Sequence, residues 1–277
     1  MKKLFLLLVV IAGFAQAWSQ YSVLTYNIRY NNPQDGEHAW PNRSHIMIDS
    51  IDHLSADIIG LQEVLFSQYK ELQHGLPKYE SYGIGRDNGK TEGEHAPIFY
   101  KKEKFSELQS GTFWLRENPS KPGTGWDAKI PRIVSWVKLK DKQSGDVLFV
   151  FNTHFDHKGV EARKNSGPLV VSKMKEIAGD AAFIFCGDLN LREDHETYKL
   201  FSAKYVDSKL GASTVSGTSY TFLGFEENKP PADPGRIDYV FLKKGAKVEM
   251  YDCMDWRRKP GAWLSDHRPV YVRIAHF

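Results

Sequence analysis

The chain has 277 residues, of which 41% are hydrophobic, 26% charged and 13% aromatic. This composition excludes a disordered chain, a collagen-like repeat and a coiled coil, and the length is enough for one large domain. Lys and Arg total 37 against 34 Asp and Glu, so neither charge is in strong excess.

The first 17 residues have the pattern of a secretory signal peptide. Lys2 and Lys3 form a short basic region, residues 4–15 are apolar, and Ala15 and Ala17 are the small residues of a cleavage site. The apolar run is too short to cross a bilayer, which needs about 20 residues, and the alternative is a buried N-terminal helix. We therefore expect a bacterial protein that is periplasmic or secreted, without a transmembrane anchor in its mature form.

One domain is predicted over 21–277, because no linker or change of composition follows the leader. Strands are predicted from β-branched and aromatic content over 22–29, 57–63, 96–101, 105–115, 133–140, 147–154, 181–188, 236–242 and 269–274. Helices are predicted over 43–55, 67–74 and 160–178, and the longest loop over 117–131. Many strands with few helices between them favour a mixed α/β sandwich.

Polar side chains stand at the ends of several of these strands. They are Asn27, Glu63, His154, Asp188, Asn190, Asp266 and His267. Any one of them is more often an ordinary turn residue. Together they predict a cleft in which oxygen ligands outnumber imidazoles, and this favours Mg²⁺ or Mn²⁺ over zinc.

The chain has two cysteines, Cys186 and Cys253. Cys186 lies in the apolar run of a predicted buried strand, where a thiol behaves as a small hydrophobic group. We expect two buried free thiols, with a disulfide as the alternative, and neither reading makes the cysteines catalytic.

Three familiar motifs are absent on inspection. Residues 85–91 resemble a phosphate-binding P-loop, but three residues separate the glycines where four are required, and a strand is expected to follow. Residues 152–157 resemble a zinc-hydrolase signature, but Asn152 stands where its first histidine belongs. The sequence also contains no G-x-S-x-G elbow, which excludes the commonest serine hydrolases.

The order of the remaining motifs identifies a family resemblance. The motifs are Tyr26-Asn27-Ile28-Arg29, Leu61-Gln62-Glu63-Val64, Thr153-His154-Phe155-Asp156, Gly187-Asp188-Leu189-Asn190, Arg236-Ile237-Asp238-Tyr239 and Ser265-Asp266-His267-Arg268-Pro269. In this order they resemble the DNase I-like endonuclease/exonuclease/phosphatase superfamily, and the chain looks like a secreted bacterial member. The resemblance implies a four-layer α-β-β-α sandwich with two packed mixed β-sheets.

The resemblance also implies roles for the carboxylates and amides. Glu63 corresponds to the carboxylate that binds the divalent metal, with Asn27 and Asp266 completing or neighbouring that site through oxygen atoms. Asp188 and Asn190 resemble the pair that positions and deprotonates the attacking water. The implied cofactor is Mg²⁺ or Mn²⁺, since a phosphate ester repels hydroxide until a cation neutralises its charge.

Two histidines complete the implied machinery. His267 corresponds to the histidine that contacts the scissile phosphate, and Asp238 to the carboxylate that orients it. A carboxylate beside an imidazole favours its charged form and fixes one tautomer. His154 looks like the second histidine, which contacts the phosphate or protonates the leaving oxygen. The alternative for Asp238 is a simple cross-strand partner of Arg236.

Two segments, 31–41 and 125–132, depart from the nuclease branches of the family. Trp40 and Trp126 lie in these segments and are predicted to line a pocket or to stack on a ring of the substrate. Core packing is the alternative for each. Additional phosphate contacts are predicted for Arg29, Arg86 and Arg132, with surface ion pairs as the alternative.

These observations predict an exported, divalent-metal-dependent phosphoesterase. Its substrate is expected to be a phosphate mono- or diester of a small molecule or a lipid head group, and no protein partner is implied. Without Lys2 and Lys3 the chain has 35 basic against 34 acidic residues, whereas nucleases on duplex DNA usually present a basic face. A nuclease on DNA or RNA is the first alternative, and a non-catalytic binding module on the same fold is the second.

Overall fold

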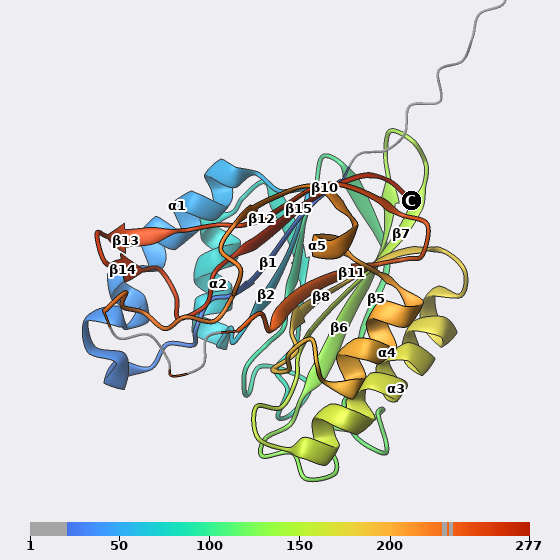
Figure 1. The fold of residues 1–277 in the computed structure, drawn as a ribbon, viewed down its shortest axis with the longest axis horizontal. Coiled ribbons are helices and arrows are strands. Elements are labelled where there is room, and N and C mark those ends of the chain that lie inside the picture. The colour runs from blue at the N-terminus through green and yellow to red at the C-terminus, as the bar shows by residue number, and fades with distance from the viewer. Residues whose placement is uncertain (1–20, 229–231, 233–234) are drawn as a thin grey trace, which may run out of the picture.

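The computed structural model describes residues 21–228, 232 and 235–277, so the predicted signal peptide over 1–17 lies outside the described residues. In this part of the chain two large mixed β-sheets lie face to face between helices (Figure 1). The predicted α/β class and four-layer order are therefore confirmed.

The first sheet has seven strands among the described residues. In spatial order they are β10 (Ala212–Gly217), β12 (Lys247–Cys253), β15 (Val270–His276), β1 (Tyr21–Asn27), β2 (Ile58–Gln62), β4 (Ile98–Lys101) and β3 (Tyr79–Tyr82). β1 and β2 run parallel, whereas β15 is antiparallel to β1. The carboxyl ends of β1 and β2 therefore meet at one edge of the sheet.

The second sheet has six strands in the described part of the chain. They are β5 (Phe105–Trp114), β6 (Ile133–Asp141), β7 (Val147–His154), β8 (Ala182–Asp188), β11 (Asp238–Leu242) and β9 (Val206–Asp207). β7 and β8 are parallel, and β11 is antiparallel to β8. Asp188 pairs in register with both His154 and Asp238, so this register places three of the predicted site residues side by side.

Helices cover the outer faces of both sheets (Figure 1). They are α1 (Ser44–Leu54) and α2 (Phe66–Gly75) on the first sheet, and α3 (Val160–Ala178) and α4 (Glu196–Lys204) on the second. Shorter elements are α5 (Ser208–Gly211), the 3₁₀ helices η1 (Pro33–His38) and η2 (Trp40–Asn42), and the hairpin of β13 (Arg257–Lys259) and β14 (Ala262–Trp263).

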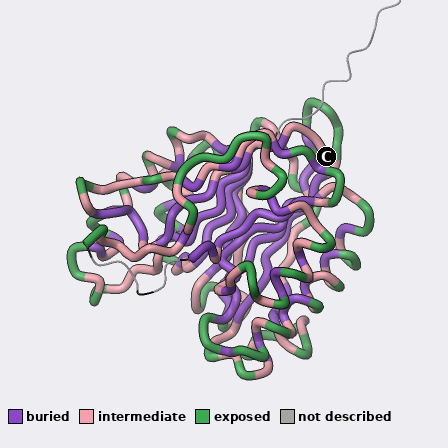
Figure 2. Tube along the Cα trace, in the orientation of Figure 1, coloured by how far each residue is buried: buried purple, intermediate pink, exposed green. Residues whose placement is uncertain are grey.

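One large apolar cluster lies between the two sheets, and two others lie between a sheet and its outer helices. Figure 2 shows the strands buried and the connecting loops exposed. Val23 and Ile58 of the first sheet belong to the same buried cluster as Val150 and Ile184 of the second. At Gly60 the sheets approach so closely that a Cβ atom would lie 2.6 Å from the Sγ of Cys186. Burial of this apolar surface is the main term that holds the sheets together.

Most predicted elements are present, with shifted ends. The strand predicted over 22–29 ends at Asn27 and that over 57–63 ends at Gln62, because Arg29 and Glu63 have positive φ angles that break the ladder. The sequence did not predict β3, β10, β12 or α4, nor the short elements β9, β13, β14, α5, η1 and η2. The segment 85–91 forms turns that lead to strand β4, which confirms that it is not a P-loop.

Both cysteines are buried and free, as predicted. Burial raises the pKa of the Cys186 thiol to about 12, so this thiol is kept protonated and inert. Over the described residues, no helix has the length and apolar character needed to cross a membrane.

Candidate active site

Polar residues from both sheets meet where the parallel strands end. Asn27 is the last residue of β1, and its side-chain Nδ2 donates to Asp188 Oδ2 of β8 at 3.0 Å and to Glu63 Oε1 at 3.1 Å. One amide therefore joins the ends of three strands across the interface between the sheets. Such an edge, outside the carboxyl ends of parallel strands, is a common place for a binding site.

Backbone conformation at this edge is unusual. Arg29, Glu63 and Asn190 have φ angles of 59°, 60° and 48°, which non-glycine residues seldom adopt. Gly187 has a φ of 143°, and a Cβ there would lie 2.0 Å from the carbonyl oxygen of Thr153, so only glycine fits before Asp188. Strained conformations that gather at one edge are typical of functional sites.

These residues line a pocket of about 440 Å³. The predicted site residues in its wall are Arg29, Glu63, Arg132, His154, Asp188, Asn190, Asp266 and His267. The wall also contains six residues that the sequence did not predict, namely Tyr30, Glu94, Ile130, His157, Phe222 and Ile237. The turn before β15 brings both Asp266 and His267 to the pocket, although they are adjacent in the sequence.

One side of the pocket is acidic. Burial, together with the nearby charges of Glu94 and Asp266, raises the pKa of Glu63. Glu63 Oε2 accepts the backbone N–H of Tyr30 at 3.1 Å, and Arg29 Nη1 lies 3.9 Å from it. Carboxylates that repel one another and offer oxygen donors are the chemistry that a hard divalent cation requires. Glu63 and Asp266, with Glu94 beside them, therefore fit Mg²⁺ or Mn²⁺.

Asn27 lies between two carboxylates of the site. Its Oδ1 accepts the backbone N–H of Arg29 at 3.0 Å, and its Nδ2 faces Glu63 and Asp188. In this orientation the nitrogen of the amide faces Glu63, and the role of Asn27 in completing or neighbouring the metal site stays a prediction. The amide holds the two carboxylates in place.

His267 and Asp238 form a buried pair. The Nδ1 of His267 lies 2.8 Å from Asp238 Oδ2, and its Nε2 lies 3.6 Å from Asp188 Oδ2. Burial alone would lower the pKa of His267, but Asp238 and Asp188 outweigh it and raise that pKa to about 10. The two carboxylates therefore favour the charged form of His267. Arg236 pairs with Asp207 and Glu193, so the alternative of an Asp238–Arg236 pair is excluded.

Asp188, Asp238 and His267 also bring ligand atoms within 4.8 Å of one another. Such a group can bind a metal in principle. Here the imidazolium of His267 opposes a second positive charge, and its Nδ1–H already donates to Asp238. The acidic side formed by Glu63 and Asp266 is the better candidate for a cation.

Asp188 and His154 form the centre of the pocket. Burial and the charge of Asp238 raise the pKa of Asp188 to about 7, which makes this carboxylate a base poised near neutral pH. Asn190 donates its backbone N–H to Asp188 Oδ1 at 2.9 Å, and its Nδ2 lies 2.9 Å from His154 Nε2.

His154 is the neutral counterpart of His267. Burial and the nearby charges of Arg132 and Arg86 lower the pKa of His154 well below its ordinary value. Its Nε2 lies 3.4 Å from Asp188 Oδ2. The lowered pKa favours the neutral form of His154, which suits a contact with the phosphate. Protonation of the leaving oxygen, the other predicted role, stays a prediction.

The three predicted arginines have different surroundings. Arg29 lines the pocket but pairs with Asp35 at 2.9 Å. Arg86 is bidentate to Glu94 at 2.7 and 2.8 Å and is not part of the pocket wall, so its predicted direct phosphate contact is not supported. Arg132 lines the pocket, and its Nη2 donates to His157 Nδ1 at 3.1 Å.

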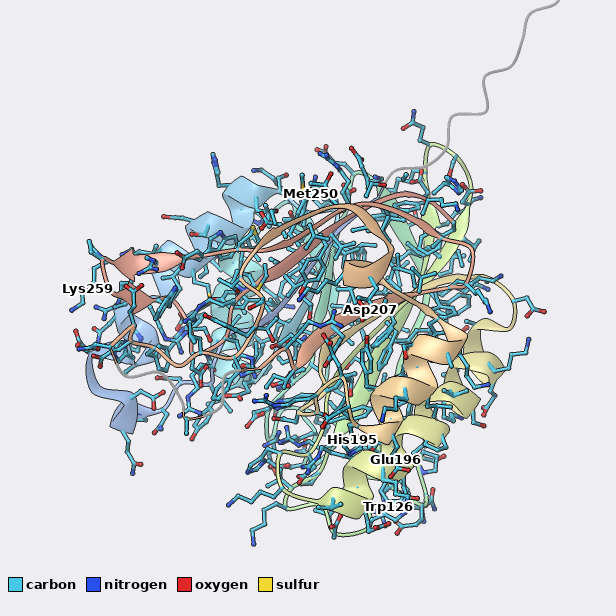
Figure 3. All side chains as sticks on the ribbon, viewed as in Figure 1. Trp126, His195, Glu196, Asp207, Met250 and Lys259 are labelled. Atoms are coloured by element: carbon cyan, nitrogen blue, oxygen red, sulfur yellow. The ribbon has the colours of Figure 1, made fainter. Side chains whose placement is uncertain are left out.

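The two predicted pocket tryptophans are not in the pocket. Trp40 is 1% exposed in the core beneath α1 and α2, where its Nε1 donates to Glu71 Oε2 at 2.7 Å. Trp126 lies beside α3 at the outer end of the molecule (Figure 3), next to Asp127, which accepts the N–H of Ala162 at the start of that helix. Core packing, the alternative for Trp40, is what the structure shows, so a direct substrate contact of Trp40 is not supported. Trp126 is not among the residues that line the pocket, and its contact with a substrate stays a prediction.

Glu94 and His157 are the two polar residues that the sequence did not predict. Glu94 follows the rejected P-loop-like segment and stands at no strand end, so no pattern marks it. His157 ends the segment 152–157 that resembled a zinc signature, and this was a usable signal.

Comparison with known proteins agrees with this geometry. A family model described as "Endonuclease/Exonuclease/phosphatase family" matches residues 24–267. A solved structure of an endonuclease/exonuclease/phosphatase from Bacteroides vulgatus is 40% identical, with a TM-score of 0.89 over 94% of this chain and 100% of that one. The mannosyl-6-phosphatase of Bacteroides thetaiotaomicron is 34% identical, with a TM-score of 0.87 over 92% of this chain and 99% of that one.

Among curated relatives, Drosophila melanogaster nocturnin is 24% identical over 78% of this chain and 38% of its own length. The chain thus spans little more than a third of some of the curated relatives that it matches.

Proposed function

Because the chain belongs to the endonuclease/exonuclease/phosphatase family, we propose that it hydrolyses a phosphate ester of a small phosphorylated molecule with Mg²⁺ or Mn²⁺. Glu63 and Asp266 are the residues that would hold the cation. When bound, the cation supplies positive charge to the phosphoryl oxygens.

The main support for the proposal is that two histidines face the same carboxylate oxygen. His154 and His267 lie 3.4 and 3.6 Å from the same oxygen of Asp188, and their pKa values are shifted in opposite directions. Groups whose pKa values are driven apart within one pocket are typical of acid–base chemistry. A binding module would not need this arrangement.

The residues divide the chemistry as follows. Asp188 accepts a proton from the attacking water, and Asn190 holds its carboxylate through the backbone N–H. His267, kept charged and oriented by Asp238, donates a hydrogen bond to a phosphoryl oxygen as negative charge develops there. His154 stays neutral and contacts the phosphoryl group beside Asp188.

A small substrate is supported by the size of the pocket and by one relative. About 440 Å³ accommodates a sugar phosphate or a lipid head group. The 34% identical neighbour from Bacteroides thetaiotaomicron is a mannosyl-6-phosphatase, so a sugar phosphate is our first choice of substrate. Nucleic acid is the second candidate, because the chain also resembles nocturnin and an RNA exonuclease of yeast.

The test is a substrate panel on the purified protein. Sugar 6-phosphates, p-nitrophenyl phosphate, bis-p-nitrophenyl phosphate, single-stranded RNA and plasmid DNA are each incubated with Mg²⁺ or Mn²⁺, and then with EDTA. We expect turnover of small esters that EDTA abolishes and that the variant His267→Gln lacks. Catalytic nicking of plasmid or degradation of RNA without turnover of small esters would establish the nuclease instead. No turnover with either metal would favour the non-catalytic module.

We also propose that the protein is exported to the periplasm or the medium, on the basis of Lys2, Lys3, the apolar run and the small residues at 15 and 17. Fractionation of the native host, with N-terminal sequencing of the mature protein, tests this. Recovery of the intact N-terminus from the cytoplasm would contradict it.

A further inference from the structure

Arg132 is a buried arginine with hydrogen-bond donors that are not used. Its side chain is 3% exposed at the wall of the pocket. Within the described residues its Nε and Nη1 have no hydrogen-bond acceptor. Asp156 is near, but its Oδ2 lies 3.7 Å from Nε, and its oxygens accept the backbone N–H groups of Lys129, Lys158 and Gly159. Native proteins rarely leave such buried donors unpaired, and a bound anion or water is a usual partner for them.

His157 adds a second donor beside Arg132. Its Nδ1 accepts a hydrogen bond from Arg132 Nη2, so the ring is neutral and its proton is on Nε2. Burial and the charge of Arg132 lower the pKa of His157, in agreement with the neutral form. His157 also lines the pocket, and its Nε2–H is therefore available to an acceptor there.

Two other arginines near the pocket are hydrogen-bonded to carboxylates. Arg86 is held by two hydrogen bonds to Glu94, and Arg29 by two to Asp35. Arg29 keeps its Nη1, which lies 3.9 Å from Glu63 Oε2 on the acidic side of the pocket. Among the described residues of the pocket wall, Arg132 is the arginine with two buried nitrogens that lack an acceptor.

The order of the strands places these donors opposite His267. In the second sheet the order is β6, β7, β8 and β11. Arg132 precedes β6, His154 and Asp188 end β7 and β8, and His267 is bonded to Asp238 at the start of β11. A phosphoryl group beside Asp188 therefore has His267 on one side and Arg132 with His157 on the other.

We propose that Arg132 and His157 select phosphate monoesters over diesters by binding the terminal oxygen that a diester has esterified. This rests on the proposed phosphoesterase function. At neutral pH a monoester is mostly a dianion with three terminal oxygens, whereas a diester is a monoanion with two. The guanidinium of arginine is charged and presents several N–H donors in one plane. It is therefore suited to the additional negative charge and the additional acceptor oxygen of a monoester.

The test compares p-nitrophenyl phosphate with methyl p-nitrophenyl phosphate, which share a leaving group. We expect the parent to prefer the monoester in kcat/KM. Arg132→Gln should lose about a hundredfold on the monoester and less than about fivefold on the diester, in line with the loss of a charge-assisted hydrogen bond. Arg273→Gln is the control, because Arg273 lies on a distant strand and pairs with Glu249. It should leave kcat/KM unchanged on both substrates.

Two further measurements separate selectivity from folding. His157→Ala alters an exposed residue, so it should fold normally and still lose monoester preference. Guanidinium chloride at low concentration should partly restore monoester turnover to Arg132→Ala, and inorganic phosphate should bind more weakly to Arg132→Gln in calorimetry.

The possible failures are distinct. Equal losses on both substrates in Arg132→Gln, with unchanged phosphate affinity, would overturn the selective role. A parent that hydrolyses the diester in preference to the monoester would overturn it too, while leaving the phosphoesterase intact. A parent that hydrolyses neither ester with metal would overturn the proposed function and this inference with it.

Discussion

At the scale of single residues, the site depends on how the buried charges are arranged around Asp188. Asn27 and Asn190 donate to its two oxygens, and two imidazoles face Oδ2. These donors orient the carboxylate, while burial keeps its pKa near 7. A base with this pKa is available at neutral pH and still accepts a proton readily.

Asp188→Asn is expected to lower kcat by about a hundredfold or more without unfolding the protein, because the amide keeps the size of the side chain and loses the base. Steady-state kinetics on the best small ester, with circular dichroism of the fold, measures this. Asp49→Asn, on the exposed face of α1, is the matched control and should behave as the parent. A variant at Asp188 with the parental rate would remove the carboxylate from the mechanism.

Asp238 and His267 are expected to act as one unit, since their hydrogen bond of 2.8 Å keeps the imidazolium charged and oriented. The double variant Asp238→Asn, His267→Gln should be little slower than the slower single variant. The four kcat/KM values form a double-mutant cycle. Losses that add fully in activation free energy would mean that the two residues act independently.

The sequence predicts the positions of some site residues better than those of others. Most of the chemical groups stand in motifs at strand ends, and the structure brings most of them together in one pocket. Trp40 was misplaced because an aromatic residue in a loop rich in Pro and Gly has the same sequence pattern whether it faces solvent or the core. Glu94 was missed because its position depends on the ion pair with Arg86, and a tertiary contact leaves no local pattern.

At the scale of elements, buried ion pairs fix the position of the strands that carry the site. Asp207 of β9 accepts hydrogen bonds from Arg236, just before β11, and from Tyr198 of α4. These contacts hold the beginning of β11, and hence Asp238, against the outer helix. Burial would raise the pKa of Asp207, but the bonds from Arg236 lower it overall.

Asp207→Asn should therefore destabilise the protein by roughly 3 kcal/mol at neutral pH, the usual cost of breaking a buried pair. Because the folded pKa of Asp207 lies below the ordinary value of 3.8, its stabilising charge is fully present above that value and is lost as pH falls through the folded pKa. The difference in stability between the parent and the variant should therefore shrink as the pH falls below the ordinary pKa of 3.8.

Urea unfolding of the parent and of Asp207→Asn at pH values above and below 3.8 checks the effect. Asp180→Asn serves as control, since Asp180 is 92% exposed and should change stability little. A difference that stays constant with pH would show that the charge of Asp207 is not the cause.

The missed elements share a weak hydrophobic pattern. β10 is exposed along nearly its whole length and consists of small polar residues, so its sequence resembles a turn. It becomes a strand only by pairing with β12. In α4 three residues are buried, Thr197, Tyr198 and Phe201, and this is too few to give a clear helical period. α3 has a longer apolar stripe and was predicted with its correct ends.

At the scale of the whole molecule, the site is a point of contact between the two sheets. Carboxylates from the first sheet, Glu63 and Asp266, lie beside Asp188 from the second. The repulsion among these carboxylates opposes the packing of the two sheets at this edge. A bound cation would neutralise the charges and so remove the repulsion.

Mn²⁺ at a hundred times its dissociation constant should stabilise the folded protein by about 3 kcal/mol, and EDTA should reverse this. Thermal unfolding with and without the metal measures the effect independently of catalysis. Glu63→Ala should lose most of it, whereas Glu80→Ala, on an exposed position of β3, should keep it. An identical response of Glu63→Ala and the parent would mean that Glu63 does not bind the metal.

The position of β15 governs when the fold can be completed. It lies between β12 and β1 although it is the last strand of the described chain, and Tyr21 pairs with Ile274. Until residues 270–276 have left the ribosome, the first sheet is divided into two parts, each with an open edge. Asp266 and His267 just before β15 are made equally late. The first sheet can therefore close only after β15 has been made, and its pairing with β1 joins residues that are about as far apart in the described chain as two residues can be, which makes this a slow, non-local step of folding.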